Sequence, residues 1–234
     1  MSKTGGGQGT NQHKAEGVGV STEDGAEHAK PESALDIFQT QFGATPIDLD
    51  AAQFLTPEYS DLETLDELNE AEVLNIAEAG LWLEEQDLAP EDVLNQSFLR
   101  GLHRRMFCEV WTWAGQLRQR ETNLGIDPLQ IQERWQALLG DVLYWIENRT
   151  YPVPEICVRL HHRMVAIHPF TNGNGRHARI TANTLAVALG QPDGMFTWGR
   201  KGGITNEAGR VKYLAALRTA DQGSYDDLVE IARS

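Results

Sequence analysis

Cysteine is scarce in this sequence, and its scarcity excludes a fold that depends on disulfides. The two cysteines of the 234-residue chain, Cys108 and Cys157, lie far apart and show no metal-ligand spacing. They suit a reducing compartment, so we expect both to be small packed side chains. The sequence also lacks any run of about 18 apolar residues, which excludes a membrane-spanning helix, and it lacks the apolar segment of a secretory signal. We therefore expect a cytoplasmic protein that does not interact with membranes.

Basic residues are rare in the first part of the chain. Residues 1–100 contain 21 acidic and 4 basic side chains, whereas residues 101–234 contain 13 acidic and 16 basic side chains. The two parts together have a net charge of −14. A nucleic-acid-binding protein needs a basic footprint, so direct binding of nucleic acid is not expected. The acidic residues are expected mainly on a solvated surface. The alternative is that the acidic half lies near the basic half and modulates it.

The domain organisation follows from composition and periodicity. Residues 1–40 are rich in glycine and polar residues and poor in aromatic residues, so we expect a disordered tail there and one domain over residues 41–234. Apolar residues recur at helical spacing, as Ile131, Trp135 and Leu138 do. This pattern predicts helices over residues 60–86, 91–111, 130–148, 154–167, 174–189 and 207–220, and after residue 224.

One segment breaks the helical pattern. The stretch from Trp113 to Pro128 lacks an apolar stripe and contains Gly115 and Gly125, which is typical of a short β-hairpin. The predicted fold is therefore all-α with one small β-hairpin.

The stretch HPFTNGNGRHARI, residues 168–180, does not look like ordinary core packing. It follows one predicted helix, and the next helix is predicted to begin near Asn174 or Gly175. The first N–H groups of a helix have no partners within it, and they carry partial positive charge. Gly173 and Gly175 allow a ligand to approach the backbone, and Asn174 adds a side-chain donor. Together these residues predict a cradle for a phosphate group.

Charged and basic side chains complete this motif. Arg176 and Arg179 lie three residues apart, so both are expected to reach one polyphosphate. The stretch is not a Walker loop, because the lysine followed by serine or threonine is missing. His168 is suited to take a proton from a hydroxyl group that attacks phosphorus.

Two alternatives compete with this interpretation. A single histidine before a glycine-rich turn is usually structural, although this explanation fits the complete set poorly. A metal site formed by His161, His162, His168 and His177 is disfavoured, because no acidic residue or cysteine completes it at a familiar spacing.

The stretch HPFTNGNGRHAR resembles the signature of the Fic/Doc (Fido) family, which runs His-Pro-Phe-x-acid-Gly-Asn-Gly-Arg-x-x-Arg. From about Thr45 onward, the sequence also resembles the subgroup called mobile mystery protein B. Three further stretches carry this resemblance: LHRRMFCEVWTWAGQLRQRETNLGIDP, HHRMVAIHPF and YLAALRTADQG. The resemblance implies the all-α Fic fold with a β-hairpin flap, with residues 168–179 as its core motif.

The resemblance also implies an activity, namely the transfer of AMP from ATP, with Mg²⁺ or Mn²⁺, to a hydroxyl side chain of a target protein. His168 would be the base, and residues 173–175 would hold the α- and β-phosphates. Arg176 would bind the β-phosphate and Arg179 the γ-phosphate. The flap would clamp the target as an added strand through Leu117, Arg118, Gln119, Arg120, Glu121, Thr122 and Asn123.

One position departs from the signature. Asn172 stands where the signature has an acidic residue that holds the metal ion, and a neutral amide oxygen is a weaker ligand for a hard dication. The alternative function is therefore a catalytically weakened or regulatory module that binds a nucleotide or a partner without AMP transfer. A site that uses a different phosphate-linked donor is a further alternative.

Regulation is the last implication of the resemblance. Many Fic proteins are inhibited by a glutamate on a defined motif, and this sequence contains no strict copy of that motif. Glu72 is in the nearest acidic helix, where we expect an ordinary glutamate exposed to water. The alternative is a less exposed side chain, because Glu72 falls on the same helical stripe as Leu68 and Ile76. Inhibition is therefore expected from a partner, and the subgroup implies a small helix-turn-helix protein that forms a toxin–antitoxin-like pair with this chain.

Overall fold

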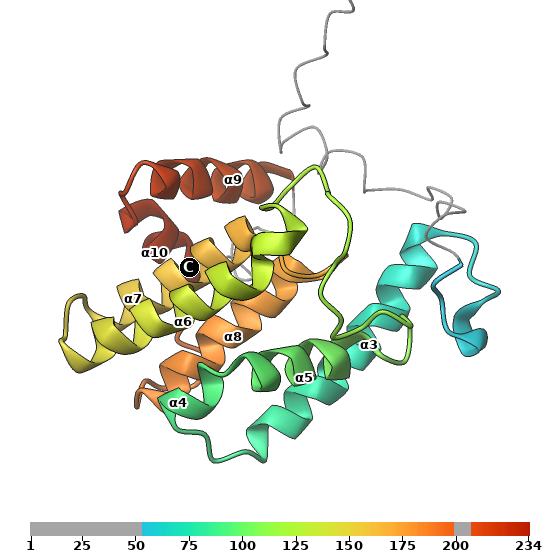
Figure 1. Cartoon of the computed structure of the whole chain (residues 1–234), viewed down its shortest axis with the longest axis horizontal. Helices are drawn as coiled ribbons and strands as arrows, with labels where there is room; N and C mark the ends of the chain where they lie inside the picture. The colour runs from blue at the N-terminus through green and yellow to red at the C-terminus, as the bar shows by residue number, and fades with distance from the viewer. Residues whose placement is uncertain (1–52, 199–206) are drawn as a thin grey trace, which may run out of the picture. The chain divides into compact units, whose positions relative to one another are not determined.

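The computed structural model describes residues 53–198 and 207–234, and their regular structure is helical (Figure 1). The helices are α3 (Leu65–Glu84), α4 (Pro90–Val93), α5 (Gln96–Phe107), α6 (Ile131–Glu147), α7 (Val153–Ile167), α8 (Asn174–Ala188), α9 (Glu207–Asp221) and α10 (Asp226–Arg233). The all-α prediction is confirmed. The predicted domain boundary near residue 40 lies outside the described residues. None of the helices in these two stretches is long and apolar enough to cross a membrane.

Local hydrogen bonds set the helix ends. Thr64 begins α3 with a capping box, in which its hydroxyl accepts from the Glu67 N–H at 3.3 Å and the Glu67 carboxylate accepts from the Thr64 N–H at 3.1 Å. The single helix predicted over residues 91–111 is wrong, because the chain breaks between α4 and α5. Asn95 causes this break, since its side-chain oxygen accepts from the Ser97 and Phe98 N–H groups at 2.8 and 3.3 Å.

The predicted β-hairpin is also wrong. Within the described residues, the only bridge between extended segments joins Leu55 and Trp111, and residues 116–127 form an irregular loop. The two ends of this loop bond to the segment after α7 instead of to each other. The Arg118 N–H donates to the Pro169 carbonyl at 3.0 Å, and the Ile126 N–H donates to the Ile167 carbonyl at 3.4 Å.

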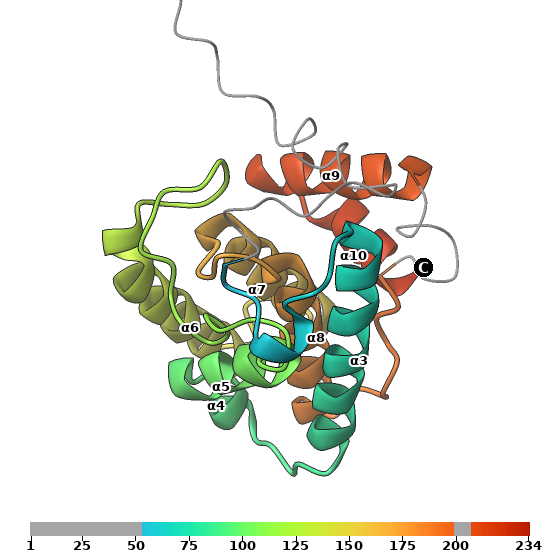
Figure 2. The same cartoon turned by 90° about the vertical axis from the view of Figure 1, so that its right-hand side faces the viewer.

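Two clusters of buried side chains hold the helices together. The larger cluster lies between α6, α7 and α8 and is completed by α9 and α10. The smaller one lies between α3 and α5 and includes Phe107 and Trp111. Figures 1 and 2 both show α7 next to α8, and α5 contacts both α3 and α8. The turn from α7 to α8 therefore lies where the two clusters meet.

Candidate active site

His168 ends α7 in the left-handed conformation, with a φ of 53°. This conformation is unfavourable for a residue with a Cβ, so neighbouring groups must hold it. The His168 N–H donates to the Met164 carbonyl at 3.0 Å. Its carbonyl accepts from Nε of Arg118 at 2.6 Å. The histidine is therefore fixed from both sides by its backbone.

The environment of His168 keeps its ring neutral. Burial lowers the pKa of His168 to about 4, and the positive charge of Arg118 adds to the effect, whereas the Val165 backbone opposes it. Near pH 7 the imidazole therefore has a free electron pair and is able to accept a proton.

Asn174 has a different role from the one expected. Its side chain accepts from the Phe170 N–H at 2.9 Å and donates to the Phe170 carbonyl at 2.8 Å. The side chain is buried, so it fastens the turn and is not free to contact a ligand. The expected side-chain donor is therefore replaced by backbone donors. The N–H groups of residues 174–176 begin α8 and have no partner within the helix.

The two glycines of the motif differ in what surrounds them. Gly173 has a φ of +76°, and a Cβ there would lie 2.4 Å from the Phe107 ring. Its lack of a side chain therefore serves packing and turn geometry. Gly175 is open on its outer side, where the nearest group is Nη1 of Arg179, 3.7 Å from the position of an added Cβ. Gly175 is thus the glycine that leaves room for a ligand, and Arg179 lies beside that space.

Arg179 lies next to a pair of buried aromatic side chains. Nε2 of His161 and the Tyr213 hydroxyl lie 2.8 Å apart, and both groups are close enough to Arg179 to be influenced by its charge. Burial raises the pKa of Tyr213, and Arg179 opposes this effect. Tyr213 of α9 therefore lies near the second arginine of the motif, a proximity that the sequence pattern did not indicate.

Arg176 is already paired. Its Nη1 lies 2.6 Å from Glu72 of α3, and its guanidinium lies 5.0 Å from the centre of the Phe107 ring. The other oxygen of Glu72 accepts from the Trp111 indole at 2.6 Å. Glu72 is 2% exposed. The expectation of a glutamate in water is therefore wrong, and this side chain contacts the first arginine of the motif.

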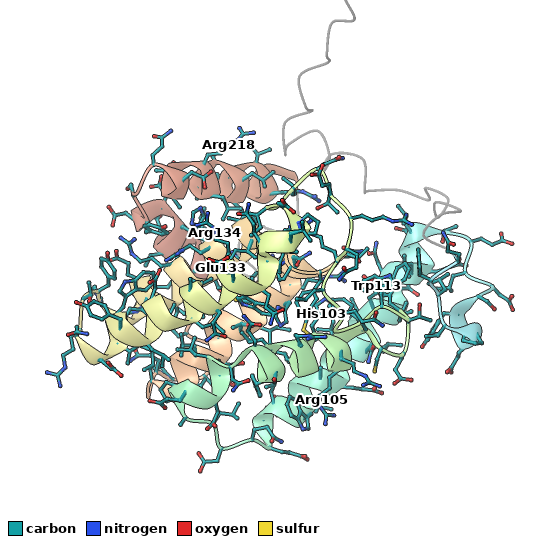
Figure 3. All side chains as sticks on the ribbon, in the orientation of Figure 1. His103, Arg105, Trp113, Glu133, Arg134 and Arg218 are labelled. Atoms are coloured by element: carbon teal, nitrogen blue, oxygen red, sulfur yellow. The ribbon has the colours of Figure 1, made fainter. Side chains whose placement is uncertain are left out.

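His103 was not predicted as a site residue, because an isolated histidine in a helix gives no signal. Its ring is fully buried and stacks on Phe170, with ring centres 3.6 Å apart. Nδ1 accepts from the Gly115 N–H at 3.0 Å, which leaves Nε2 to donate to the Asn172 carbonyl at 3.1 Å. His103 therefore fixes the turn that contains the motif. Its ring lies on the side of α5 toward Trp113 (Figure 3), with the two ring centres 6.0 Å apart.

The other histidines have separate partners. His162 lies 2.8 Å from Asp221, and Nε2 of His177 lies 2.9 Å from the Leu99 carbonyl. In the part of the chain that the structure describes, no three histidine, cysteine or acidic side chains lie together as metal ligands. The four-histidine metal site considered from the sequence is therefore not formed.

Asn172 is exposed, and its side-chain oxygen accepts from the Gly173 N–H at 2.7 Å. The only oxygen of this amide therefore keeps one lone pair for a further ligand. The side chains of the turn do not by themselves fit a divalent cation, which requires several hard oxygen ligands.

The expected flap residues fall into two groups. Arg118 is 4% exposed and donates to the carbonyls of Arg120, Ile126 and His168, so it anchors the loop and cannot contact a target. Leu117 is half-buried. The exposed members of the expected flap are Gln119, Arg120, Glu121, Thr122 and Asn123. The loop is also pressed against the site, because a Cβ on Gly125 would lie 2.6 Å from the Cβ of His168.

Comparisons with known proteins show what this chain is similar to. The model of the Fic/DOC family matches residues 93–186. The protein adenylyltransferase fic-1 of Caenorhabditis elegans is 26% identical over 149 residues, covering 60% of this chain and 25% of that protein. The probable protein adenylyltransferase Fic of Escherichia coli K12 is 31% identical over 103 residues, covering 39% of this chain and 50% of that protein. The crystal structure of BepC from Bartonella tribocorum with bound AMPPNP has a TM-score of 0.59 at 15% identity, covering 80% of this chain and 97% of the BepC chain.

This chain therefore spans between 25% and 50% of the length of the two curated relatives. The structural likeness concerns the fold. Residues 93–186, which include His168, the start of α8 and both arginines, match the model of the Fic/DOC family.

Proposed function

We propose that this protein is a protein adenylyltransferase, which transfers AMP from ATP to a hydroxyl side chain of a target protein. The observation that carries the proposal is that neutral His168 ends α7 and only the short turn of residues 169–173 separates it from the N–H groups that begin α8 without partners in the helix. A base next to an anion-binding helix end is the arrangement that attack on a phosphate requires. The names of the relatives and the AMPPNP bound to BepC support this choice of reaction and nucleotide.

The proposed reaction moves one proton and exchanges one bond at phosphorus. The target hydroxyl gives its proton to His168, and its oxygen forms a bond with the α-phosphorus of ATP. The bond from that phosphorus to the oxygen bridging the α- and β-phosphates breaks, and pyrophosphate leaves. A free pKa of about 4 makes His168 a weak base. The negative charge of bound phosphates would raise this pKa toward the working range.

The phosphates would be held mainly by the backbone. The N–H groups of residues 174–176 would bind the α- and β-phosphates, and Arg179 beside Gly175 would neutralise the γ-phosphate. Arg176 would bind the β-phosphate only after it leaves Glu72, with which it is now paired. The pairing of Glu72 with Arg176 would therefore keep ATP affinity low until α3 or Glu72 moves.

Mg²⁺ or Mn²⁺ would enter with ATP and be held chiefly by its phosphates. The turn contributes no carboxylate, and the Asn172 oxygen is a neutral ligand that already accepts one hydrogen bond, so no step of the proposed reaction is assigned to a metal ligand of this chain. The exposed loop residues 119–123 would contact the backbone of the target.

The wider assignment includes a partner. We assign the chain to the mobile mystery protein B subgroup, acting in the bacterial cytoplasm as the toxin of a pair with a small helix-turn-helix protein. The second functional hypothesis is a regulatory module that binds ATP without transferring AMP. Asn172 and the occupied Arg176 are the observations that favour this second hypothesis.

The deciding experiment measures transfer of label from α-labelled ATP, with Mg²⁺ or Mn²⁺, into the protein itself and into a bacterial lysate. Wild type and His168→Ala are compared, and thermal unfolding checks that the variant is folded. We expect transfer by the wild type and a loss of roughly 100-fold or more in the variant. Label that persists in His168→Ala contradicts the assigned base. ATP binding without any transfer favours the regulatory module.

A further inference from the structure

A recess lies on the opposite side of α5 from the residues that face the motif. It has a volume of about 530 Å³ and runs along the outer face of α5, with residues 111–116 as its other wall. The helix contributes Ser97, Arg100, Gly101, Arg104 and Cys108 to the lining. His168 and α8 contribute nothing to it. We call this recess the α5 groove.

The charge of the α5 groove differs from that of the molecule. The chain has a net charge of −14, yet no acidic side chain lines the groove, whereas Arg100 and Arg104 both do. The two arginines are exposed and one helical turn apart. Within residues 53–198 and 207–234, neither guanidinium forms an ion pair. The groove is therefore a local cationic site on an acidic protein.

The wall of the groove is fixed by specific contacts. Nε of Arg100 donates to the Gly115 carbonyl at 3.0 Å, and the Gly115 N–H donates to His103 at 3.0 Å. Gly115 also packs directly on Arg104, since an added Cβ would lie 2.8 Å from the Arg104 Cβ. Arg100 is thus held in place before a ligand arrives, which lowers the entropy lost on binding.

The length of the groove indicates the kind of ligand. From Ser97 to Cys108 the helix rises by about 16 Å, at about 1.5 Å per residue. A single phosphate or carboxylate needs a small part of this length, whereas an extended peptide of about five residues covers it. The remaining polar lining residues, Ser97, Thr112 and Gln116, are suited to hydrogen bonds with a peptide backbone.

We propose that the α5 groove binds an extended peptide segment rich in aspartate and glutamate, with Arg100 and Arg104 pairing with its carboxylates. Gly101 forms the floor between the two arginines, where an added Cβ would meet no atom within 4 Å. This open floor leaves room for the peptide chain. The site is independent of AMP transfer, and binding is measurable without ATP.

The test uses the full chain and a fluorescently labelled peptide of eight glutamates, with fluorescence anisotropy as the readout, in 0.15 M salt. Arg104→Gln removes one cation from the groove, and Gly101→Leu fills its floor without changing charge. Arg105→Gln is the matched control, because Arg105 lies on the same helix but stacks over Trp82 and does not line the groove. We expect Kd to rise roughly fivefold or more for the first two variants and less than about twofold for the control.

Three results would overturn the proposal. Equal binding of a peptide of eight glutamines would exclude recognition by carboxylates. An equal loss in Arg105→Gln would indicate a response to net charge alone. Citrate that competes as strongly as the peptide would indicate a site for small anions only. Loss of fold is not an explanation for weak binding by Gly101→Leu, because replacing an exposed helical glycine is expected to raise the melting temperature.

Discussion

At the scale of single residues, Glu72 has the largest consequence for the site. It is buried between the indole of Trp111 and the guanidinium of Arg176. A buried carboxylate is stable only where it is paired, and here both of its oxygens have partners. The same contact that stabilises Glu72 removes Arg176 from the phosphates. Stability of the α3–α8 contact and affinity for ATP therefore oppose each other.

The variant Glu72→Gln separates these two effects. Glutamine can still accept from Trp111, but it no longer holds the charge of Arg176. We expect ATP to bind roughly tenfold more tightly, which corresponds to about 1.4 kcal/mol, and the free energy of unfolding to fall by about 1–3 kcal/mol. Calorimetric titration with ATP and urea denaturation measure the two quantities. Glu70→Gln, at an exposed position of the same helix, is the charge-matched control. Unchanged ATP affinity in Glu72→Gln would show that the pair does not restrain Arg176.

Asn172 leads to a second prediction at this scale. Its only oxygen accepts from the Gly173 N–H, whereas an aspartate has a second oxygen for a metal ion. We expect Asn172→Asp to tighten binding of Mn²⁺-ATP roughly tenfold while binding of metal-free ATP does not improve. Titrations with and without Mn²⁺ measure the difference. Thr171→Asp adds the same charge at the neighbouring exposed position, and an equal gain in this control would argue against a specific ligand.

The sequence predicted the local part of the site and missed its distant contacts. The end of α7 at His168 and the start of α8 at Asn174 follow from residues that are adjacent in the chain. Glu72 and His103 contact the motif from positions 104 and 69 residues away, and no local pattern marks such contacts. The helical spacing of Glu72 with Leu68 and Ile76 was the one available signal that its side chain faces the core.

At the scale of elements, the loop between α5 and α6 shows why the predicted hairpin failed. Gly115, Gly125 and the absence of a helical pattern correctly predict a break between two helices. The side chain of Arg118 then bonds to carbonyls of both the loop and the end of α7, which a sequence pattern does not encode. The helices themselves were predictable, because an apolar stripe of period 3.6 depends only on residues within each helix.

The loop is expected to control the position of His168. In Gly125→Ala, the new methyl group would lie 2.6 Å from the Cβ of His168, so one of the two must move. We expect AMP transfer to fall by roughly tenfold or more, because a small displacement of a base is costly. Gly190→Ala is the matched control, since Gly190 also has a positive φ of +76° but meets no atom within 4 Å. Transfer assays and melting temperatures on both variants separate displacement of His168 from backbone strain. Equal losses in the two variants would contradict the role of the loop.

At the scale of the whole molecule, several histidines are buried in the neutral form. Burial lowers the pKa of His177 to about 4 and the pKa values of His103 and His161 well below the usual value. In the unfolded chain these groups take up protons near pH 6.5. Between that pH and about 4 the unfolded state therefore binds more protons than the folded state, and acid favours unfolding.

We therefore expect the free energy of unfolding to fall as the pH decreases from 7 to 4.5. His177 alone accounts for a loss of about 3 kcal/mol over its complete pKa difference. The net charge of −14 has the opposite effect, because acid reduces repulsion between carboxylates, but salt at 0.15 M screens exposed charges beyond about 8 Å. Urea unfolding at several pH values in this salt measures the balance. His177→Gln, whose amide can still donate to the Leu99 carbonyl, is expected to be less stable at pH 7 and to lose less stability in acid. Stability that stays constant or rises between pH 7 and 4.5 would show that the buried histidines do not control acid unfolding.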